Sequence, residues 1–223
     1  MIVKKMPILQ GFPDFETVKF FTGKFFQKYN FTPVFYDIET TGLSRNSTYL
    51  YLIGAVGIED ETWNFYQWMA ENANEEETIL RIFSQFLQQC DLLISYNGDR
   101  FDQPYLEARY EKYGIPSPFT GKQSLDLYLT LKPLKSLLKL SAMKQPCMEE
   151  FLGIKDRIYD NGKECIKLYK DFLKKEMPLQ LMKSLDTTWR MCWDWEESLI
   201  CWDIFASMME IMKLHTANLT ETT

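Results

Sequence analysis

Residues 34–43, which read VFYDIETTGL, decide the fold class that we predict for this chain. The apolar, β-prone residues before Asp37 predict a buried strand, and the Thr-Thr-Gly after Glu39 is typical of a strand passing into a loop. Because side chains alternate along a strand, Asp37 and Glu39 point to the same face and can reach one hard cation. By itself such a carboxylate pair is more often a solvated strand edge.

A further carboxylate follows a second short apolar run, residues 92–96. Asn97 and Gly98 are typical of a turn, and they carry the chain to Asp102 near the first turn of a helix. The helix dipole favours a negative charge at that end. Asp102 can therefore belong to an acidic site, or it can be a helix cap, which is a common role for aspartate.

Hydrophobic periodicity predicts a mixed α/β domain around these two segments. Two β-branched and aromatic runs, separated by an acidic turn, predict a hairpin that extends the antiparallel pairing of the first strand. The sheet then has three antiparallel strands plus two parallel ones, it is flanked by helices, and the C-terminal third is helical. The predicted strands are 34–38, 49–58, 63–69, 92–96 and 124–127, and the predicted helices are 74–89 and 104–113.

Length and composition are those of one ordinary globular domain, with 223 residues, 46% apolar and 25% charged. No apolar run is long enough for a membrane span or a secretory signal, so we expect a cytoplasmic protein without a membrane partner. We predict an N-terminal extension at 1–30, a single domain at 31–214 and a frayed tail at 215–223. The sequence indicates no particular oligomeric state.

The cysteine and histidine contents leave carboxylates as the ligands for any metal. The five cysteines are scattered and form no C-x-x-C pair, which argues against a disulfide framework and against a zinc site. The one histidine, His215, lies near the C-terminus, so neither a histidine-based metal site nor a Ser-His-Asp triad is expected.

Charge is unevenly distributed along the chain. Residues 132–175 contain 11 Lys and Arg against 6 Asp and Glu, a local net charge of +5. Because the whole chain has a net charge of −6, the remaining residues carry a net charge of −11. Two interpretations account equally well for this excess of positive charge, namely solvated helix faces and a surface that binds phosphates. In the second case Lys132, Lys135 and Lys139 would contact the nucleic acid.

The two acidic segments are similar to known sequence motifs. DIETTGL at 37–43 resembles the first motif of the DEDD-type 3′–5′ exonucleases, and NGDRFD at 97–102 resembles their second. Together with YLIG at 51–54, SLDLY at 124–128 and E-x-F-L-G-I at 149–154, these motifs resemble, in order and spacing, the YprB-type ribonuclease H-like family. The resemblance covers roughly residues 33–175 and implies a ribonuclease H-like fold.

This resemblance implies a metal-dependent phosphodiesterase that acts on single-stranded DNA or RNA ends. Two Mg²⁺ or Mn²⁺ ions would be held by Asp37, Glu39, Asp102 and a fourth aspartate on a late helix, and they would activate water and stabilise the leaving oxygen. The resemblance also implies a set of residues near the terminal nucleotide, of which Asp126 is equally well explained as a helix N-cap. This set is Thr40, Thr41, Gly42, Leu43, Asn97 and Asp126.

The sequence departs from the family at the last motif. There the family has a histidine, the general base, four residues before the fourth metal aspartate. Asp203 is the best candidate for that aspartate, but Leu199 occupies the position of the base. The alternatives, Asp194 and Glu197, have Arg190 and Trp193 there, and His215 has no aspartate four residues after it.

Three functional hypotheses follow from these observations. The first is a divalent-metal-dependent 3′–5′ exonuclease with Asp37, Glu39, Asp102 and Asp203 as catalytic residues. The second is a nucleic-acid-binding or scaffold protein of the same fold whose catalysis has decayed, because a positioned base contributes about 10²- to 10⁴-fold to the rate. The third is a partner-binding domain that uses the Trp-rich stretch 189–202, although helical spacing there is more typical of a core.

Overall fold

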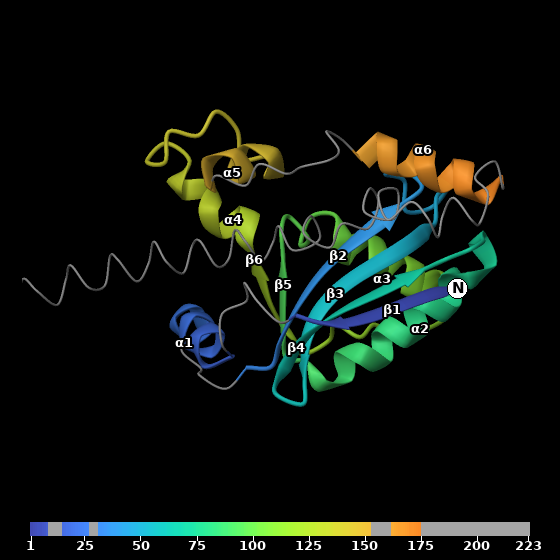
Figure 1. Cartoon of the computed structure of the whole chain (residues 1–223), viewed down its shortest axis with the longest axis horizontal. Helices are drawn as coiled ribbons and strands as arrows, with labels where there is room; N and C mark the ends of the chain where they lie inside the picture. Colours follow the sequence, from blue (N-terminus) through green and yellow to red (C-terminus); the bar gives the residue numbers. More distant parts are fainter. Residues whose placement is uncertain (9–14, 27–30, 153–161, 175–223) are drawn as a thin grey trace, which may run out of the picture.

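The fold is built on one mixed sheet of six strands (Figure 1). The computed structural model describes residues 1–8, 15–26, 31–152 and 162–174. Across the sheet the strands follow the order β1-β4-β3-β2-β5-β6. Their bounds are β1 Ile2–Pro7, β2 Pro33–Thr40, β3 Leu50–Glu59, β4 Thr62–Met69, β5 Leu92–Ser95 and β6 Gln123–Asp126.

The centre of the sheet has the predicted mixture of strand directions. β2 pairs antiparallel with β3 and parallel with β5, and β5 pairs parallel with β6. β3 and β4 form the predicted hairpin, with Asp60 and Glu61 at φ 50° and 59°. Two successive residues with positive φ match the right-handed twist of the flanking strands, so the acidic turn closes the hairpin in only two residues.

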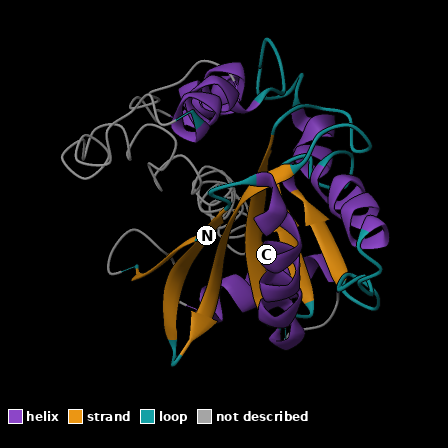
Figure 2. Ribbon diagram, turned by 90° about the vertical axis from the view of Figure 1, so that its right-hand side faces the viewer, coloured by secondary structure: helices purple, strands orange, loops and turns teal. Residues whose placement is uncertain are grey.

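Helices cover both faces of the sheet (Figure 2). The longest predicted helix is present as a 3-10 turn η1, helix α2 and a second turn η2, and the helix after Asn97-Gly98 is present as α3. Helix α3 ends shortly before Gly114, whose positive φ of +62° is typical of the residue that follows a helix. The helical bounds are α1 Phe15–Phe26, η1 Ala73–Glu75, α2 Glu76–Phe86, η2 Leu87–Gln89, α3 Asp102–Lys112, α4 Leu127–Leu131, η3 Lys132–Leu134, α5 Gln145–Leu152 and α6 Gly162–Leu173.

Alternation along β2 divides the buried residues into two clusters. Val34, Tyr36 and Ile38 join the cluster that includes side chains of α2 and α3, whereas Phe35 joins the cluster that includes side chains of α1, α4 and α5. A strand that is covered on both faces is rich in apolar residues at successive positions, as observed for residues 33–36. Asp37 and Glu39 share the face of Phe35.

The predicted fold class is confirmed, and the sheet is larger than predicted. β1 pairs antiparallel with β4 over six residues, from Ile2–Met69 to Pro7–Asn64. It therefore adds a sixth strand from the segment that we predicted as an N-terminal extension, and α1 lies in the same segment. The helical character predicted after residue 127 is confirmed for α4, α5 and α6, while residues 175–223 lie outside the described part.

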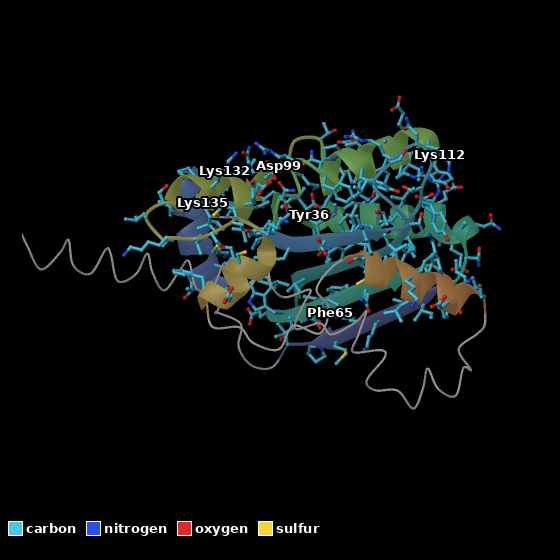
Figure 3. All side chains as sticks on the ribbon, turned by 90° about the horizontal axis from the view of Figure 1, so that it is seen from above. Tyr36, Phe65, Asp99, Lys112, Lys132 and Lys135 are labelled. Atoms are coloured by element: carbon cyan, nitrogen blue, oxygen red, sulfur yellow. The ribbon has the colours of Figure 1, made fainter. Side chains whose placement is uncertain are left out.

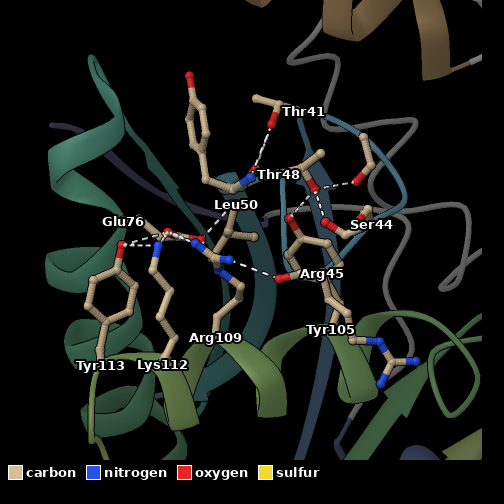
Figure 4. A network of polar contacts seen from close by, with 12 residues as sticks. Thr41, Ser44, Arg45, Thr48, Leu50, Glu76, Tyr105, Arg109, Lys112 and Tyr113 are labelled. Atoms are coloured by element: carbon tan, nitrogen blue, oxygen red, sulfur yellow. Dashed lines mark hydrogen bonds and ion pairs between the residues drawn. The ribbon is translucent and has the colours of Figure 1, made fainter.

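A buried ion pair joins α2, α3 and the loop after β2 (Figure 4). The Arg109 guanidinium donates from Nε and Nη2 to the two carboxylate oxygens of Glu76, at 2.6 and 2.5 Å. Arg109 also donates to the carbonyl oxygen of Arg45 at 2.9 Å, and Glu76 accepts from the backbone N–H of Leu50 and from the Tyr113 hydroxyl, both at 2.8 Å. Both charged side chains are almost fully buried.

We predict that Arg109→Met lowers the free energy of unfolding by about 3–5 kcal/mol, because it leaves the Glu76 carboxylate buried without its counter-ion. Urea denaturation followed by circular dichroism measures this loss. The control is Arg81→Met, which breaks an exposed pair with Glu77 and should cost no more than about 0.5 kcal/mol. Equal losses in the two variants would contradict the prediction.

Candidate metal and nucleic-acid site

β2 places the first two carboxylates in the middle of the sheet. Asp37 is paired with Gly54 and Glu39 with Leu52 on β3, and a bulge follows between Glu39 and Thr40. Ladder pairing on this strand fixes the backbone of both acidic residues, and the bulge ends regular pairing where the loop begins. Asp37 and Glu39 therefore project from a rigid element to one side of the sheet.

Asp102 reaches the same end of the sheet from the turn after β5. Asn97 has φ +65°, and a side chain on Gly98 would place its Cβ 2.2 Å from Ser95 Oγ, so only glycine fits this close approach. The turn closes with a hydrogen bond from the N–H of Gln103 to the carbonyl of Gly98, at 2.9 Å. Asp102 is the first residue of α3, which agrees with its predicted place near the first turn of a helix. Its side chain is buried.

Burial and proximity make this group of carboxylates electrostatically unfavourable. Burial raises the pKa of Asp37 from 3.8 to about 6, and hydrogen bonding from the backbone of Ile38 only partly offsets this. Burial also raises the pKa of Asp102 well above its usual range, and the negative charges of Asp37 and Glu39 raise it further. Both carboxylates therefore bind a proton more tightly than they would in water, and a cation beside them would compensate their charge.

Tyr36 precedes Asp37 on β2, and its buried side chain lies on the opposite face of the sheet, in the cluster that includes side chains of α2 and α3. The Tyr36 hydroxyl faces Ser95 Oγ, but among the described residues neither makes a hydrogen bond of ordinary geometry. Burial, together with the charges of Asp102 and Asp99, raises the pKa of Tyr36 well above 10. Tyr36 therefore stays protonated at neutral pH and does not serve as a proton acceptor. The sequence alone did not single out this residue.

The predicted nucleotide-contact residues after β2 form a loop that is held by its own hydrogen bonds. Thr40 Oγ1 donates to the carbonyl of Gly42 at 2.9 Å, and Thr41 Oγ1 donates to that of Tyr49 at 3.3 Å. Thr48 Oγ1 contacts the Tyr105 hydroxyl of α3 at 2.8 Å and so ties this loop to the helix of Asp102 (Figure 4). Leu43 is 84% exposed, free to contact a ligand.

Asp126 has the role of a helix N-cap and also braces the turn before Asp102. Its carboxylate accepts from the N–H of Leu129 at 3.1 Å, which caps α4. The same carboxylate accepts from the N–H of Asn97 at 2.9 Å and from that of Asp99 at 3.2 Å. The bond from Leu129 confirms the N-cap interpretation, and the bonds from Asn97 and Asp99 join α4 to the β5–α3 turn.

The remaining predicted carboxylates cannot be placed. Asp203, Asp194 and Glu197 lie outside the described residues, as do His215 and the Trp-rich stretch. Within the described part, no group of three or more His, Cys, Asp or Glu side chains is gathered closely enough to hold a metal ion. The donor chemistry nevertheless fits a hard divalent cation, because Asp37 and Asp102 offer carboxylate oxygens whose negative charges are desolvated and raise the pKa of Asp102.

This fold and site define a ribonuclease H-like α/β protein with neighbouring carboxylates at the end of the central strand. A sequence profile described as RNase_H_2, of the RNase H superfamily, matches residues 34–186. The match covers more than half of the chain. The chain therefore belongs to the RNase H superfamily.

Two curated relatives share short segments with this chain. A DNA polymerase of Methanocaldococcus jannaschii is 50% identical over 42 residues, which is 19% of this chain and 2% of the relative. DNA polymerase 1 of Aeropyrum pernix is 34% identical over 59 residues, 26% of this chain and 6% of the relative. The chain thus spans only a small part of the polymerases that it matches.

A solved polymerase structure supports the fold. The family B DNA polymerase from the hyperthermophilic archaeon Pyrobaculum calidifontis superposes with a TM-score of 0.53 at 17% identity, over 68% of this chain and 22% of the polymerase. A structure of exonuclease I gives a TM-score of 0.48 at 13% identity, over 71% and 44% of the two chains. In the described ranges, no helix is long and apolar enough to span a membrane.

We predict that Asp37→Asn raises the free energy of unfolding of the metal-free protein at pH 7 by about 1–3 kcal/mol. The pKa of Asp37 is about 6 in the folded protein and 3.8 without burial, so the folded state holds the proton more tightly. The free energy of unfolding of the unsubstituted protein therefore falls as the pH rises from about 4 to about 6, and asparagine removes part of this slope.

Urea denaturation in EDTA at a series of pH values measures both effects. Glu111→Gln, which neutralises an exposed carboxylate on the same helix as Asp102, is the control and should leave the slope unchanged. A slope that is the same in Asp37→Asn and in the unsubstituted protein would show that Asp37 is ionised in the folded state at pH 5.

Proposed function

We propose that this protein is a divalent-metal-dependent 3′–5′ exonuclease of the YprB type that hydrolyses single-stranded DNA or RNA ends. The observation that carries the proposal is the placing of Asp37 and Asp102 together at the end of the central strand, where desolvation raises the pKa of each and the charge of Asp37 raises that of Asp102 further. Membership of the RNase H superfamily and the similarity to DNA polymerases support it.

In this proposal Asp37, Glu39 and Asp102 hold Mg²⁺ or Mn²⁺, with Asp203 as the fourth ligand and Asp194 or Glu197 as alternatives. The metal would supply an activated water and stabilise the charge on the leaving oxygen. Thr40, Thr41, Gly42, Leu43 and Asn97 would position the terminal nucleotide. The loop of Thr41 and Leu43 is fixed to α3 through Thr48 and Tyr105, so nucleotide contacts and carboxylates share one rigid frame.

The proton acceptor of the reaction is not a buried tyrosine next to the carboxylates. Burial raises the pKa values of both Tyr36 and Tyr105, so both are protonated at neutral pH. No described residue is a histidine. We therefore expect slower turnover than in an enzyme with a positioned general base, by about 10²- to 10⁴-fold.

A nucleic-acid-binding protein without catalysis is the second candidate. The observation that favours it is the absence of a histidine four residues before Asp203, Asp194 or Glu197. The fold, the basic surface and the carboxylates would then serve to hold a strand. The two candidates differ in one outcome, which is whether a bound strand is cut.

We predict that the protein shortens a 5′-labelled single-stranded oligonucleotide from its 3′ end in the presence of Mn²⁺. Asp37→Asn should lower the rate by at least about 100-fold, because a ligand of the metal is lost. Gel electrophoresis over a time course measures the rate, and a ladder that shortens one nucleotide at a time reports the polarity. Glu111→Gln is the matched control.

If the oligonucleotide binds but stays intact over a range of metals and pH, the protein is the second candidate, a nucleic-acid-binding protein without catalysis. Degradation that persists equally in Asp37→Asn would indicate a contaminating nuclease and contradict the proposed site.

We also predict that Mn²⁺ raises the thermal unfolding temperature of the unsubstituted protein and not that of Asp37→Asn. A cation that binds only the folded state stabilises it by about 2.7 kcal/mol at 100 times its dissociation constant. Differential scanning fluorimetry with a Mn²⁺ titration tests binding independently of activity. An equal rise in both proteins would place the binding site elsewhere.

A further inference from the structure

The segment 127–148 has an unbalanced positive charge, and we refer to it as the basic segment. It contains four lysines and no aspartate or glutamate, whereas the whole chain has a net charge of −6. It comprises α4, η3 and the connection into α5. The lysines are Lys132, Lys135, Lys139 and Lys144, of which all but the half-buried Lys135 are exposed.

Two cations from different parts of the chain meet on one aromatic ring of this segment. The guanidinium carbon of Arg100 lies 5.9 Å from the centroid of the Tyr128 ring, and the Lys132 ammonium lies 6.0 Å from the same centroid. The ring of Tyr96 meets Tyr128 edge-on, at 5.9 Å and 79°, and the Tyr96 hydroxyl donates to the carbonyl of Met143 at 2.7 Å. The aromatic pair therefore has a fixed position.

Contact with a ring leaves the charge of a cation uncompensated. Several other cations of the fold are paired with carboxylates, as in Lys5–Glu59, Arg81–Glu77 and Arg109–Glu76. By contrast, Arg100, Lys132 and Lys135 form no ion pair with any carboxylate of the described ranges. The quadrupole of the Tyr128 ring attracts Arg100 and Lys132 without cancelling their charge, so both remain available to an anion, as does Lys135.

The basic segment is attached to the candidate site. Asp126 caps α4 and accepts from the backbone of Asn97 and Asp99, so the basic segment begins next to the turn that ends in Asp102. Figure 3 shows Lys132 and Lys135 at the end of the molecule where Asp99 lies, far from Lys112. Arg100 itself lies two residues before Asp102. An anion on these cations would therefore adjoin the carboxylates.

We propose that Arg100, Lys132 and Lys135 form a phosphate-binding track that holds a single strand of nucleic acid whose end lies at the carboxylates. This inference rests on the proposed function and adds the surface that grips the strand. Proteins that bind single strands combine cations along the backbone with aromatic side chains. A strand that follows this track passes over Tyr128, whose ring positions two of the three cations.

An anionic membrane is the competing partner for such a surface. The basic segment also exposes Leu134 and Leu137, by 40% and 77%, and lysines beside exposed apolar residues are typical of membrane-surface segments. Nucleic acid is favoured because one of the two cations held by Tyr128 is Arg100, which lies outside the basic segment, in the turn that leads to Asp102.

The test is the salt dependence of binding to a fluorescent single-stranded 20-nucleotide oligonucleotide in EDTA, measured by fluorescence anisotropy. Each phosphate contact contributes about 0.7 to the slope of log K against log salt for a single strand. Lys132→Gln/Lys135→Gln should reduce the slope by about 1.4 and weaken binding at 0.1 M salt by about 10- to 30-fold. Adding Arg100→Gln should reduce the slope by about a further 0.7.

The matched control is Lys4→Gln/Lys112→Gln, which removes two positive charges from β1, at the other edge of the sheet, and from the end of α3. Its slope should be unchanged. An unchanged slope in Lys132→Gln/Lys135→Gln, or an equal reduction in the control, overturns the proposal. Binding to vesicles of phosphatidylserine and phosphatidylcholine also overturns the proposal if the two lysine substitutions abolish it and the oligonucleotide does not compete with it.

A second variant separates the role of the ring from that of the charges. Tyr128→Leu should weaken binding with little change in slope, since the cations remain, whereas Tyr128→Phe should bind as the unsubstituted protein does. All these measurements are made without metal, so they do not depend on cleavage. Cleavage with Mn²⁺ that is unaffected by the lysine substitutions would overturn the phosphate-binding track and support the nuclease function. A reduced slope in a protein that does not cleave would support the track and contradict the nuclease function.

Discussion

The ion pair between Glu76 and Arg109 fixes the relative positions of the two segments that carry the candidate site. Arg109 belongs to the helix that begins with Asp102, and it also holds the backbone of Arg45 in the loop after Glu39. Glu76 in turn holds the N–H of Leu50, where the next strand begins. A bidentate pair without access to water has one favourable geometry, so the loop, β3 and α3 are held in one arrangement.

The acidic residues that are shielded from solvent in this fold differ in whether their negative charge has a positively charged partner. The charge of the fully buried Glu76 is compensated by a guanidinium and by two hydrogen bonds from neutral donors. Asp37 and Asp102 have no ion pair with a described lysine or arginine, and their pKa values are raised instead. A divalent cation would compensate them without any change of the backbone, because β2 and α3 already hold both residues. This contrast is the physical basis of the proposed nuclease function.

Local sequence signals were sufficient for most of the fold and for part of the site. Alternation, turn residues and the Gly after α3 predicted β2 to β6, the hairpin and the two long helices, because these depend on residues close in sequence. β1 and α1 were not predicted, since an edge strand without a neighbouring hairpin gains its stability from pairing with β4, 57 to 67 residues later in the chain. The metal and nucleotide roles of Asp37, Glu39, Asp102 and the loop of Thr40 remain predictions.

The sequence by itself determined that Asp37 and Glu39 share one face of a strand and that Asp102 begins a helix, because both follow from backbone geometry over a few residues. Only the tertiary structure decided which glutamate of 75–77 is the buried partner of Arg109, and that Arg100 and Lys132 meet on Tyr128. Burial and charge compensation depend on residues that are distant in sequence, so identical letters such as these three glutamates acquire different roles only when the chain has folded.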